Sequence, residues 1–407
     1  MKTMLASLLA LIITTCVSVN PARGESAPGG TALSILNTAE APDHPRMQHA
    51  LSVLRREYPD VQVAFSEVYD MRVPATAMLR GDPSIDIVAV QEYGGLCSRA
   101  LYAAGALYDL YAFRDIRAQM DAWIDIDGVF GMDGGLFGVP QAVYPYVWRA
   151  NAPLFEALQI PLPRADWTWQ DFFSLCQAVG DINARQGTQY AVLADRSFPY
   201  ILNQYNMNHI DIGRQIAAFD TPAFAWLMDS WRTAQDIGVL LLSDDAIHLD
   251  PMPDHALLQV MQGQYDMLRD TPLVLPPRLD AADRFPAVTI ALVLNRHSQN
   301  AEIAARFLSH YASPDALRAA GIENTGLLLR EQAPPEYGQA DISPEAAVQQ
   351  PDLYWLYLME HGTQEFFDGP IIRSQMMDLY PRFMRGEVTA AQFARLVQQV
   401  ADEAFAQ

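Results

Sequence analysis

Three aromatic residues at every second position are the first feature of the sequence that could recognise a ligand. Tyr144, Tyr146 and Trp148 alternate within the run QAVYPYVW. Alternate residues of a strand point to the same face of a sheet, so the three rings should line up. A row of rings is a platform for the flat apolar face of a sugar, whose hydroxyls need polar side chains nearby. The alternative is packing in a core, which we expect for Trp148.

Catalytic and cofactor-binding motifs are missing from the sequence. The only lysine is Lys2, so the mature chain has no phosphate-binding Gly-x-x-x-x-Gly-Lys loop. The motifs Gly-x-Gly-x-x-Gly, Gly-x-Ser-x-Gly, His-Glu-x-x-His and Cys-x-x-Cys are also absent. The eight histidines lack metal-ligand spacing, and residues 125–128 begin like a calcium loop but have no bidentate glutamate downstream. We predict no catalytic residue, no cofactor and no metal ion.

The composition indicates a two-domain protein that does not bind nucleic acid. The chain has 407 residues, half of them hydrophobic, which is enough for two sizeable cores. Its formal net charge of −21 would repel nucleic acid and anionic lipid surfaces. We expect a monomer whose acidity serves solubility.

The first residues predict export. Met1 and Lys2 form a short positive region, and residues 5–19 are apolar over the length of a signal peptide rather than of a membrane span. We predict a signal peptide over residues 1–24, and hence a periplasmic or secreted protein. One alternative is a lipid anchor on Cys16, for which the preceding Thr15 is a poor fit, and another is a core helix of a cytosolic protein.

The remaining cysteines, Cys97 and Cys176, could pair in an oxidising compartment. We place them in different lobes, where a disulfide would join parts that should move. We therefore expect two buried free thiols, because free cysteine packs as a small hydrophobic residue.

Alternating strand and helix patterns in the first 110 residues predict a parallel α/β unit. Strands are expected at 31–37, 61–65 and 85–90, with helices at 46–58, at 75–80 and from 94 onward. Ligands of such sheets lie at the carboxyl ends of the strands. This directs attention to the loop 38–44 and to residues 91–93.

The later part of the chain predicts a second α/β unit after an extended step at Gly138-Val139-Pro140, the candidate first hinge. Thr168 and Asp171 form a capping box for a helix, and Thr389 and Gln392 another. We expect strands at 190–194 and 287–294, an aromatic loop or short helix at 198–205, helices behind Thr221, at 255–262 and from 300, and a loop-rich stretch over 326–351.

Several short motifs, taken in order, resemble the extracellular solute-binding proteins of ABC transporters (family 1, maltose- or oligosaccharide-binding-like). The resemblance covers residues 31–405. In the first part of the chain it rests on the run 84–90, on Gly94-Gly95, on residues 107–110 and on the step 138–140. Later it rests on Thr168-Trp169, on Gly263 with Met267, on Phe307-Leu308 followed by residues 312–315, and on the turn 385–389. At Gln264 and Tyr265 the sequence departs from the family pattern.

The resemblance implies an α/β, periplasmic-binding-protein-like fold: two α/β lobes with mostly parallel sheets, joined by hinge strands. It divides the chain into a first lobe of residues 30–140 plus 268–312 and a second lobe of residues 141–267 plus 313–407. Two lobes between which the chain passes several times are typical of a protein whose cleft closes by hinge motion.

The ligand-binding residues that follow lie near the predicted hinge and strand ends. In the family, the loops of the first lobe reach the ligand, and we assign the same role to the matching loop residues of this chain. The other residues are assigned a ligand contact because of their position along the chain. The set is Glu40, Gln91, Glu92, Tyr93, Tyr144, Tyr146, Tyr200, Asn203, Asp270, Phe367 and Arg373.

The expected function is capture of a carbohydrate or polyol and delivery to an ABC permease, with no catalysis. A ligand sensor of the same fold that feeds a membrane receptor stays open, as does binding of an amine or another small solute. A neighbouring permease gene would favour transport and a neighbouring sensor kinase would favour sensing. A secreted glycoside-active enzyme is the remaining alternative, because carboxylates are abundant.

Overall fold

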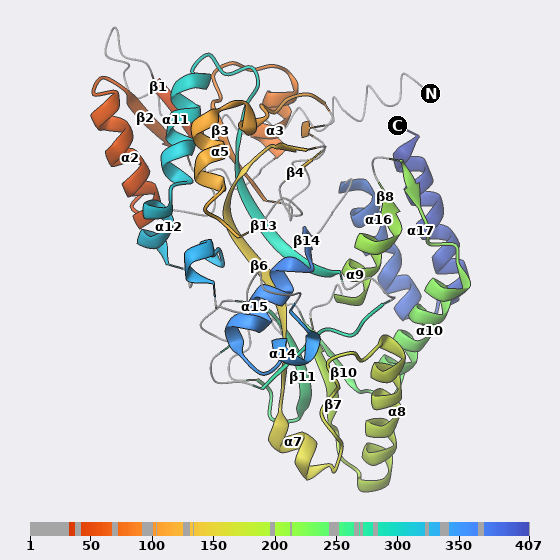
Figure 1. The fold of residues 1–407 in the computed structure, drawn as a ribbon. Coiled ribbons are helices and arrows are strands. Elements are labelled where there is room, and N and C mark those ends of the chain that lie inside the picture. The colour runs from red at the N-terminus through yellow and green to blue at the C-terminus, as the bar shows by residue number, and fades with distance from the viewer. Residues whose placement is uncertain are drawn as a thin grey trace.

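The protein is described in a computed structural model (Figure 1). The structure describes residues 32–36, 42–66, 72–91, 101–102, 104–124, 131–132, 134–195, 200–211, 214–243, 252–263, 268, 272–279, 284–321, 325–333, 342–364 and 370–406. The predicted signal peptide, Cys16, Cys97 and the turn at 125–128 lie outside these residues.

The first α/β unit has the predicted order of strands and helices. β1 (Ala32–Leu36) is parallel to β2 (Gln62–Ser66) and to β3 (Ile87–Gln91), and α2 (Pro45–Glu57) and α3 (Arg72–Leu79) connect them. Helix α2 buries Met47, Leu51 and Leu54 at the predicted helical spacing, and Arg55 and Arg56 are exposed. The predicted parallel unit is confirmed.

Two long strands run from this unit into the rest of the molecule. β6 (Val139–Ala150) pairs antiparallel with β13 (Phe285–Leu294) through its first half, and with β11 (Ala256–Gln262) through its second half. β13 also pairs antiparallel with β3. The main sheet therefore has the order β10-β7-β11-β6-β13-β3-β1-β2, and β6 belongs to both of its halves (Figure 1).

The second α/β unit lies at the other end of β6. β7 (Ala191–Asp195) is parallel to β10 (Leu240–Leu242) and to β11, while α8 (Trp169–Gln186) and α10 (Pro222–Asp236) lie together at the side of these strands (Figure 1). The capping box of α8 is confirmed, because Thr168 Oγ1 accepts from the Asp171 amide at 3.3 Å and Asp171 Oδ2 accepts from the Thr168 amide at 2.9 Å.

The helix predicted over residues 255–262 is wrong, because most of this segment is strand β11. Its residues ALLQVMQ pair with β6 on one side and with β7 on the other. A short apolar run that is buried on both faces cannot be assigned to a helix or a strand from its periodicity. The aromatic segment at 198–205, predicted as a loop or a short helix, contributes to α9 (Tyr200–His209).

The chain ends in a set of helices. α11 (Ala301–Tyr311) and α12 (Pro314–Ala320) pack on α2, while α16 (Pro370–Met384) and α17 (Ala390–Phe405) pack on each other, with α17 also on α10. The capping box of α17 is confirmed by the mutual bonds of Thr389 and Gln392. The smaller elements are η1 (Leu110–Ala112), α5 (Arg114–Met120), β4 (Gly131–Met132), β5 (Gly135–Leu136), α7 (Ala152–Ala157), β8 (Ile210–Asp211), β9 (Ile216–Ala217), β12 (Leu273–Val274), η4 (Arg330–Gln332), α14 (Pro344–Ala347), α15 (Pro351–Glu360) and β14 (Gly362–Gln364).

Two large hydrophobic clusters correspond to the two halves of the sheet. The first cluster, here called the first core, gathers side chains of β1, α2, β3 and α11, together with residues 353–359 of α15. The second core gathers side chains of α8, α9, α10, α16 and α17. The boundaries of the predicted lobes stay a prediction. The packing shows in addition that α15 lies in the first core.

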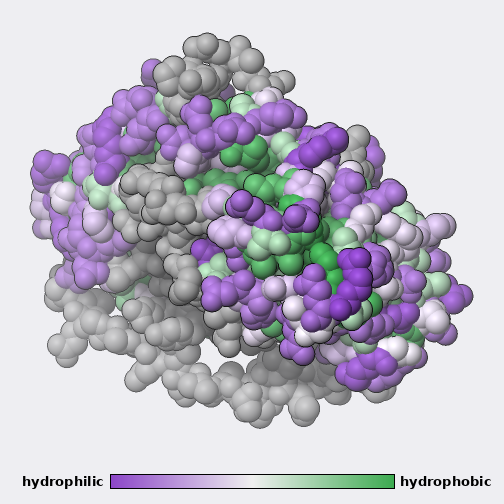
Figure 2. Space-filling view, turned by 90° about the horizontal axis from the view of Figure 1, so that it is seen from below, coloured by the Kyte–Doolittle hydropathy of each residue, from purple (hydrophilic) through white to green (hydrophobic). Residues whose placement is uncertain are grey.

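Figure 2 shows one face of the molecule, on which hydrophobic residues gather near the centre with hydrophilic residues beside them. Of the described helices, none is both long enough and apolar enough to cross a membrane.

Candidate functional site

The candidate site is the junction where β6 and β13 pass from the first core to the second. Tyr144 lies at this point on β6, paired with Val288 of β13. Its half-buried ring packs against both cores. Any rotation of one half of the molecule against the other would change the surroundings of this ring.

The next two rings of the alternating run are in the second core. Tyr146 is 2% exposed and Trp148 is fully buried. Trp148 contacts Trp167, Trp169 and Phe172 edge to face, with centroid distances of 5.9 to 6.3 Å. The prediction that Trp148 is core is confirmed.

Helix α9 reaches the same face of β6. The ring of Tyr200 lies 5.9 Å from that of Tyr146 and 5.3 Å from that of Trp148, edge to face in both cases. The Tyr200 amide donates to Asp195 Oδ2 at 2.8 Å, so the last residue of β7 accepts from the first turn of the helix. The first turn of α9 is thereby fixed beside the strand face that carries Tyr144 and Tyr146.

Asn203, one turn along α9 from Tyr200, is the least satisfied polar side chain of the junction. It is 1% exposed, and within the described part of the chain both its Oδ1 and its Nδ2 are buried without a hydrogen-bond partner. Asn206 on the same helix leaves its Oδ1 unpaired, and its Nδ2 has only Met376 Sδ at 4.0 Å. A buried polar group without a partner costs about 1 to 3 kcal/mol, so native proteins rarely keep one without a use.

Two glycines allow other segments to pass close to β6 at the junction. A Cβ on Gly326, where φ is +66°, would lie 2.0 Å from the carbonyl oxygen of Val143. A Cβ on Gly263 would lie 2.4 Å from Val147 Cγ2. Only residues without a side chain fit at these two positions.

Helix α15 closes the junction from the side of the first core. The Trp355 indole donates to the Gly326 carbonyl at 3.0 Å. The buried Tyr354 hydroxyl donates to the Val274 carbonyl at 2.9 Å and accepts from the Trp148 amide at 3.1 Å, so it links β12 to β6. Burial raises the pKa of Tyr354, which therefore stays a neutral donor.

Helix α15 was not among the elements predicted from the sequence. The signal that could have found it is the run LYWLYLM at 353–359, seven apolar or aromatic residues directly after Pro351 and Asp352. Such a run behind a proline at the first helical position is typical of a buried helix.

The other predicted ligand-binding residues are only partly described. Gln91 ends β3 and pairs with Ile290 of β13, and Arg373 lies in the first turn of α16. Of the described residues in this set, Tyr146 and Tyr200 are in ring contact, Tyr144 lies two residues before Tyr146 on β6, and Asn203 lies three residues after Tyr200 on α9. Glu40, Glu92, Tyr93, Asp270 and Phe367 lie outside the described residues.

Cys176 is a buried free thiol, as predicted, and burial raises its pKa. Among the described residues, no group of three or more His, Cys, Asp or Glu side chains could hold a metal ion.

A family model described as bacterial extracellular solute-binding protein matches residues 45–317, about two thirds of the chain. None of the curated proteins matches the sequence.

Solved structures share the fold at low sequence identity. A putative oligosaccharide periplasmic-binding protein from a Synechococcus species aligns with a TM-score of 0.65 and 16% identity, over 92% of this chain and 99% of its own. The cyclic alpha-maltosyl-1,6-maltose binding protein of Arthrobacter globiformis aligns with a TM-score of 0.63 and 17% identity, over 93% and 99%. The GacH receptor of Streptomyces glaucescens, solved unliganded and with acarbose, aligns with a TM-score of 0.64 and 12% identity, over 93% and 99%. The periplasmic-binding-protein-like α/β fold predicted from the sequence is confirmed.

Proposed function

The chain belongs to the bacterial extracellular solute-binding proteins, and we propose that it is the substrate-binding component of an ABC importer for a carbohydrate or polyol. The ligand is captured at the junction between the two halves and delivered to the transmembrane subunits of the permease. The protein acts as a periplasmic or secreted monomer and carries out no reaction itself.

Two observations carry the proposal: an aromatic ring lies at the junction, and α9, which packs in the second core, holds an unpaired buried amide. Tyr144 packs against both cores, and among the described residues Asn203 keeps one acceptor and two donor hydrogens unused. A sugar needs an apolar platform together with side chains that both donate and accept hydrogen bonds. Two of the fold relatives are named for oligosaccharide or maltosyl-maltose binding and a third was solved with acarbose, which supports this ligand class.

The remaining ligand contacts are proposed around these two residues. Tyr146 and Tyr200 lie against each other on the second half, and Gln91 ends a strand of the first half. Arg373, at the start of α16, is proposed as a late contact, together with Glu40, Glu92, Tyr93, Asp270 and Phe367.

Binding would work by differential affinity for two arrangements of the halves. Contacts from both halves exist only when the halves close, so the ligand stabilises the closed arrangement. The strands β6 and β13 connect the halves and are the proposed hinges, with a third crossing between α15 and α16 because α15 packs in the first core.

A thermal-shift screen against sugars, polyols, amines and amino acids tests the proposal. A ligand at about 100 times its Kd should add about 2.7 kcal/mol to the free energy of unfolding. We expect a sugar or polyol to raise the Tm, and Tyr144→Ala to abolish this shift while leaving the unliganded Tm nearly unchanged. Tyr190→Ala, at the margin of the second core, is the matched control and should keep the shift.

Two results would reject the proposal in different ways. If an amine raises the Tm and no sugar or polyol does, the ligand class is wrong. If Tyr144→Ala lowers the unliganded Tm as much as a core truncation and keeps the ligand shift, Tyr144 is a packing residue and the site lies elsewhere.

A further inference from the structure

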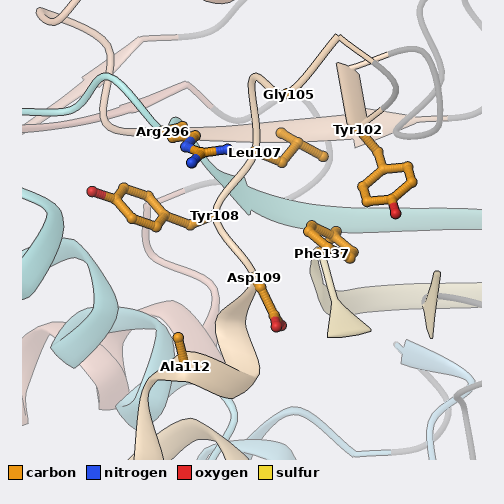
Figure 3. Close-up of a pocket in the computed structure, with 8 residues that line it drawn as sticks. All are labelled: Tyr102, Gly105, Leu107, Tyr108, Asp109, Ala112, Phe137 and Arg296. Atoms are coloured by element: carbon orange, nitrogen blue, oxygen red, sulfur yellow. The ribbon is translucent and has the colours of Figure 1, made fainter. Parts of the chain in front are cut away.

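A cavity in the first half lies well away from the junction. It has a volume of about 370 Å³, and the residues that line it include Tyr102, Leu107, Tyr108, Phe137 and Arg296 (Figure 3). It adjoins the end of β13 at Leu294, whereas the junction lies at Val288, and six strand residues span roughly 20 Å. Tyr144, Tyr146, Tyr200 and Asn203 are not among the described residues that line this cavity.

Backbone hydrogen bonds fix the wall that separates the cavity from the sheet. The Tyr108 amide donates to the Leu294 carbonyl at 3.0 Å, and the Arg296 amide donates to the Ala106 carbonyl at 2.9 Å. Segment 106–108 is thus joined to the end of β13 on both sides of the bridge between Leu107 and Asn295. The positions of Tyr108 and Arg296 are therefore set before any ligand arrives.

Asp109 braces the floor of the cavity. Its Oδ1 accepts from the Tyr111 amide at 3.0 Å and from the Leu136 amide at 3.1 Å. These bonds tie β5, and with it the neighbouring Phe137, to the segment that carries Tyr108. The carboxylate of Asp109 serves the structure of the cavity wall.

The cavity has an apolar end and a cationic end. The rings of Tyr102 and Phe137 lie 4.5 Å apart at 58°, on the side away from Tyr108 and Arg296 (Figure 3). The Arg296 side chain is exposed, and no described residue forms a hydrogen bond or ion pair with its guanidinium. A guanidinium that no described residue pairs, beside the ring of Tyr108, can bind an anion from outside.

We propose that this cavity is a second ligand site, which binds a small carboxylate whose ring presents a flat apolar face. The planar guanidinium of Arg296 matches the two oxygens of a carboxylate. The ring of the ligand lies against Tyr102 and Phe137, since aromatic side chains pack on flat apolar faces. The cavity volume falls within the range of small-molecule sites. This site is independent of the proposed function of the junction.

Calorimetric titration of the purified protein with two carboxylates and two neutral analogues tests the proposal. The probes are benzoate and glucuronate, with benzyl alcohol and glucose as their uncharged partners. We expect at least one carboxylate to bind, its neutral partner to bind at least tenfold more weakly, and the affinity for the carboxylate to fall with added salt. Binding of benzoate alone identifies an aromatic acid, and binding of glucuronate alone identifies a sugar acid.

Variants assign the binding to the cavity. Arg296→Gln should weaken carboxylate binding at least tenfold, while Arg55→Gln, an exposed arginine of α2, should leave it unchanged. Phe137→Ala should weaken it as well, and Tyr144→Ala at the junction should not, which separates this proposal from the first. The proposal is overturned if neither carboxylate binds at about 10 mM, a concentration that would reveal a Kd near 1 mM. It is also overturned if the neutral analogues bind equally well or if Arg296→Gln has no effect.

Discussion

Two buried polar side chains, Asp86 in the first half and Asn203 in the second, are treated in opposite ways by the fold. Asp86 is 1% exposed and accepts from the Ser34 amide at 2.7 Å, from the Ser298 hydroxyl at 2.5 Å and from Asn300 Nδ2 at 3.3 Å. Asn203 is equally buried, and both of its amide atoms lack a partner within the described chain. The satisfied group holds the structure together, and the unsatisfied group is the one that we propose as a ligand contact.

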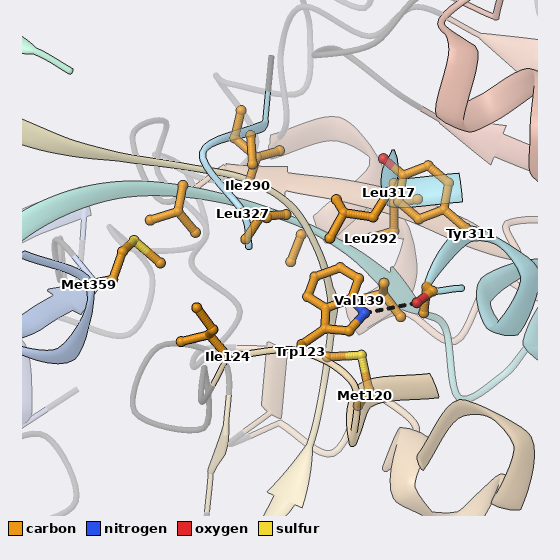
Figure 4. Packing of buried hydrophobic residues seen from close by; sticks show 14 of the residues in the cluster. Met120, Trp123, Ile124, Val139, Ile290, Leu292, Tyr311, Leu317, Leu327 and Met359 are labelled. Carbon is orange, nitrogen blue, oxygen red and sulfur yellow. Dashed lines mark hydrogen bonds between the residues drawn. The ribbon is translucent and has the colours of Figure 1, made fainter. Parts of the chain in front are cut away.

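Two buried tryptophans also differ in whether their indole nitrogen has a hydrogen-bond partner. The Trp123 indole donates to the Ala312 carbonyl at 2.9 Å in the first core (Figure 4). The Trp148 indole nitrogen in the second core is buried with no partner among the described residues. Arg46, the buried cation of the first half, donates from Nε and Nη1 and lies over the rings of Trp123 and Tyr311, so that only Nη2 stays unpaired. Arg46 thus leaves a single donor atom unpaired, whereas both amide atoms of Asn203 are unpaired among the described residues.

Removing the Asp86 carboxylate should lower the free energy of unfolding more than any other change considered below. Asp86→Ala leaves the Ser34 amide, the Ser298 hydroxyl and Asn300 Nδ2 without their acceptor, which should cost about 3 to 5 kcal/mol in urea unfolding. Asp229→Ala, an exposed partner of Arg232, is the control and should change stability by about 0.5 kcal/mol or less. Similar losses from both variants would contradict a structural role for the Asp86 network.

An added methyl group at the junction between the halves should lower stability nearly as much, because there is no space for it. Gly326→Ala places a methyl group 2.0 Å from the Val143 carbonyl oxygen at a φ of +66°, and we expect a loss of about 3 kcal/mol. Gly187→Ala is a matched control, because its φ is +67° and nothing lies within 4 Å of the added carbon. It should lose only about 1 kcal/mol, the cost of the left-handed backbone alone. Equal losses in the two variants would mean that segment 325–327 is not pressed against β6.

Removing the hydrogen-bonded link that α15 forms across the junction should lower the free energy of unfolding by a smaller amount. Tyr354→Phe removes the hydroxyl that joins the Trp148 amide to the Val274 carbonyl, at a cost of about 1 to 2 kcal/mol. Hydrogen exchange measured by mass spectrometry should show faster exchange of the Trp148 amide, with no change in β1. Tyr190→Phe, whose hydroxyl forms no hydrogen bond with a described residue, is the control. Unchanged exchange at Trp148 would show that Tyr354 does not hold this amide.

The ion pair of α2 with α11 should contribute least. Arg306 donates to both carboxylate oxygens of Glu57 and holds the pKa of that carboxyl below its usual range. A lowered pKa in the folded state gives stability that is fully present above the ordinary pKa of a glutamate and is lost as the pH falls through the lowered value. Because both side chains are about one third exposed, Glu57→Gln should cost about 0.5 kcal/mol at neutral pH and nothing once the carboxyl is protonated. A cost that persists in acid would assign the effect to packing.

Much of the architecture was predictable from local signals in the sequence. Strand alternation, the capping boxes at Thr168 and Thr389 and the helical spacing of Met47, Leu51 and Leu54 are properties of short segments. The segment β11 was mistaken for a helix because pairing on both sides, and not periodicity, decides its conformation. The buried helix α15 was not identified, although the apolar run at 353–359 behind Pro351 was a local signal for it.

The candidate site was predictable only in part. The row of rings at Tyr144, Tyr146 and Trp148 was visible in the sequence, but the depth at which each ring lies depends on partners such as Tyr200 and Trp169, far along the chain. That Asn203 has no partner is a property of the whole packed structure and leaves no trace in the sequence.

The most direct test is to replace Asn203 by leucine and to measure both stability and ligand binding. Leucine has a similar size and no polar atoms, so Asn203→Leu should keep or raise the unliganded Tm, because it removes two unpaired buried groups. The Kd for the sugar or polyol that gives the largest thermal shift should rise at least tenfold, whereas Asn206→Leu should alter it much less. If Asn203→Leu lowers the unliganded Tm and leaves the Kd unchanged, Asn203 belongs to the structure of the second core and the central claim fails.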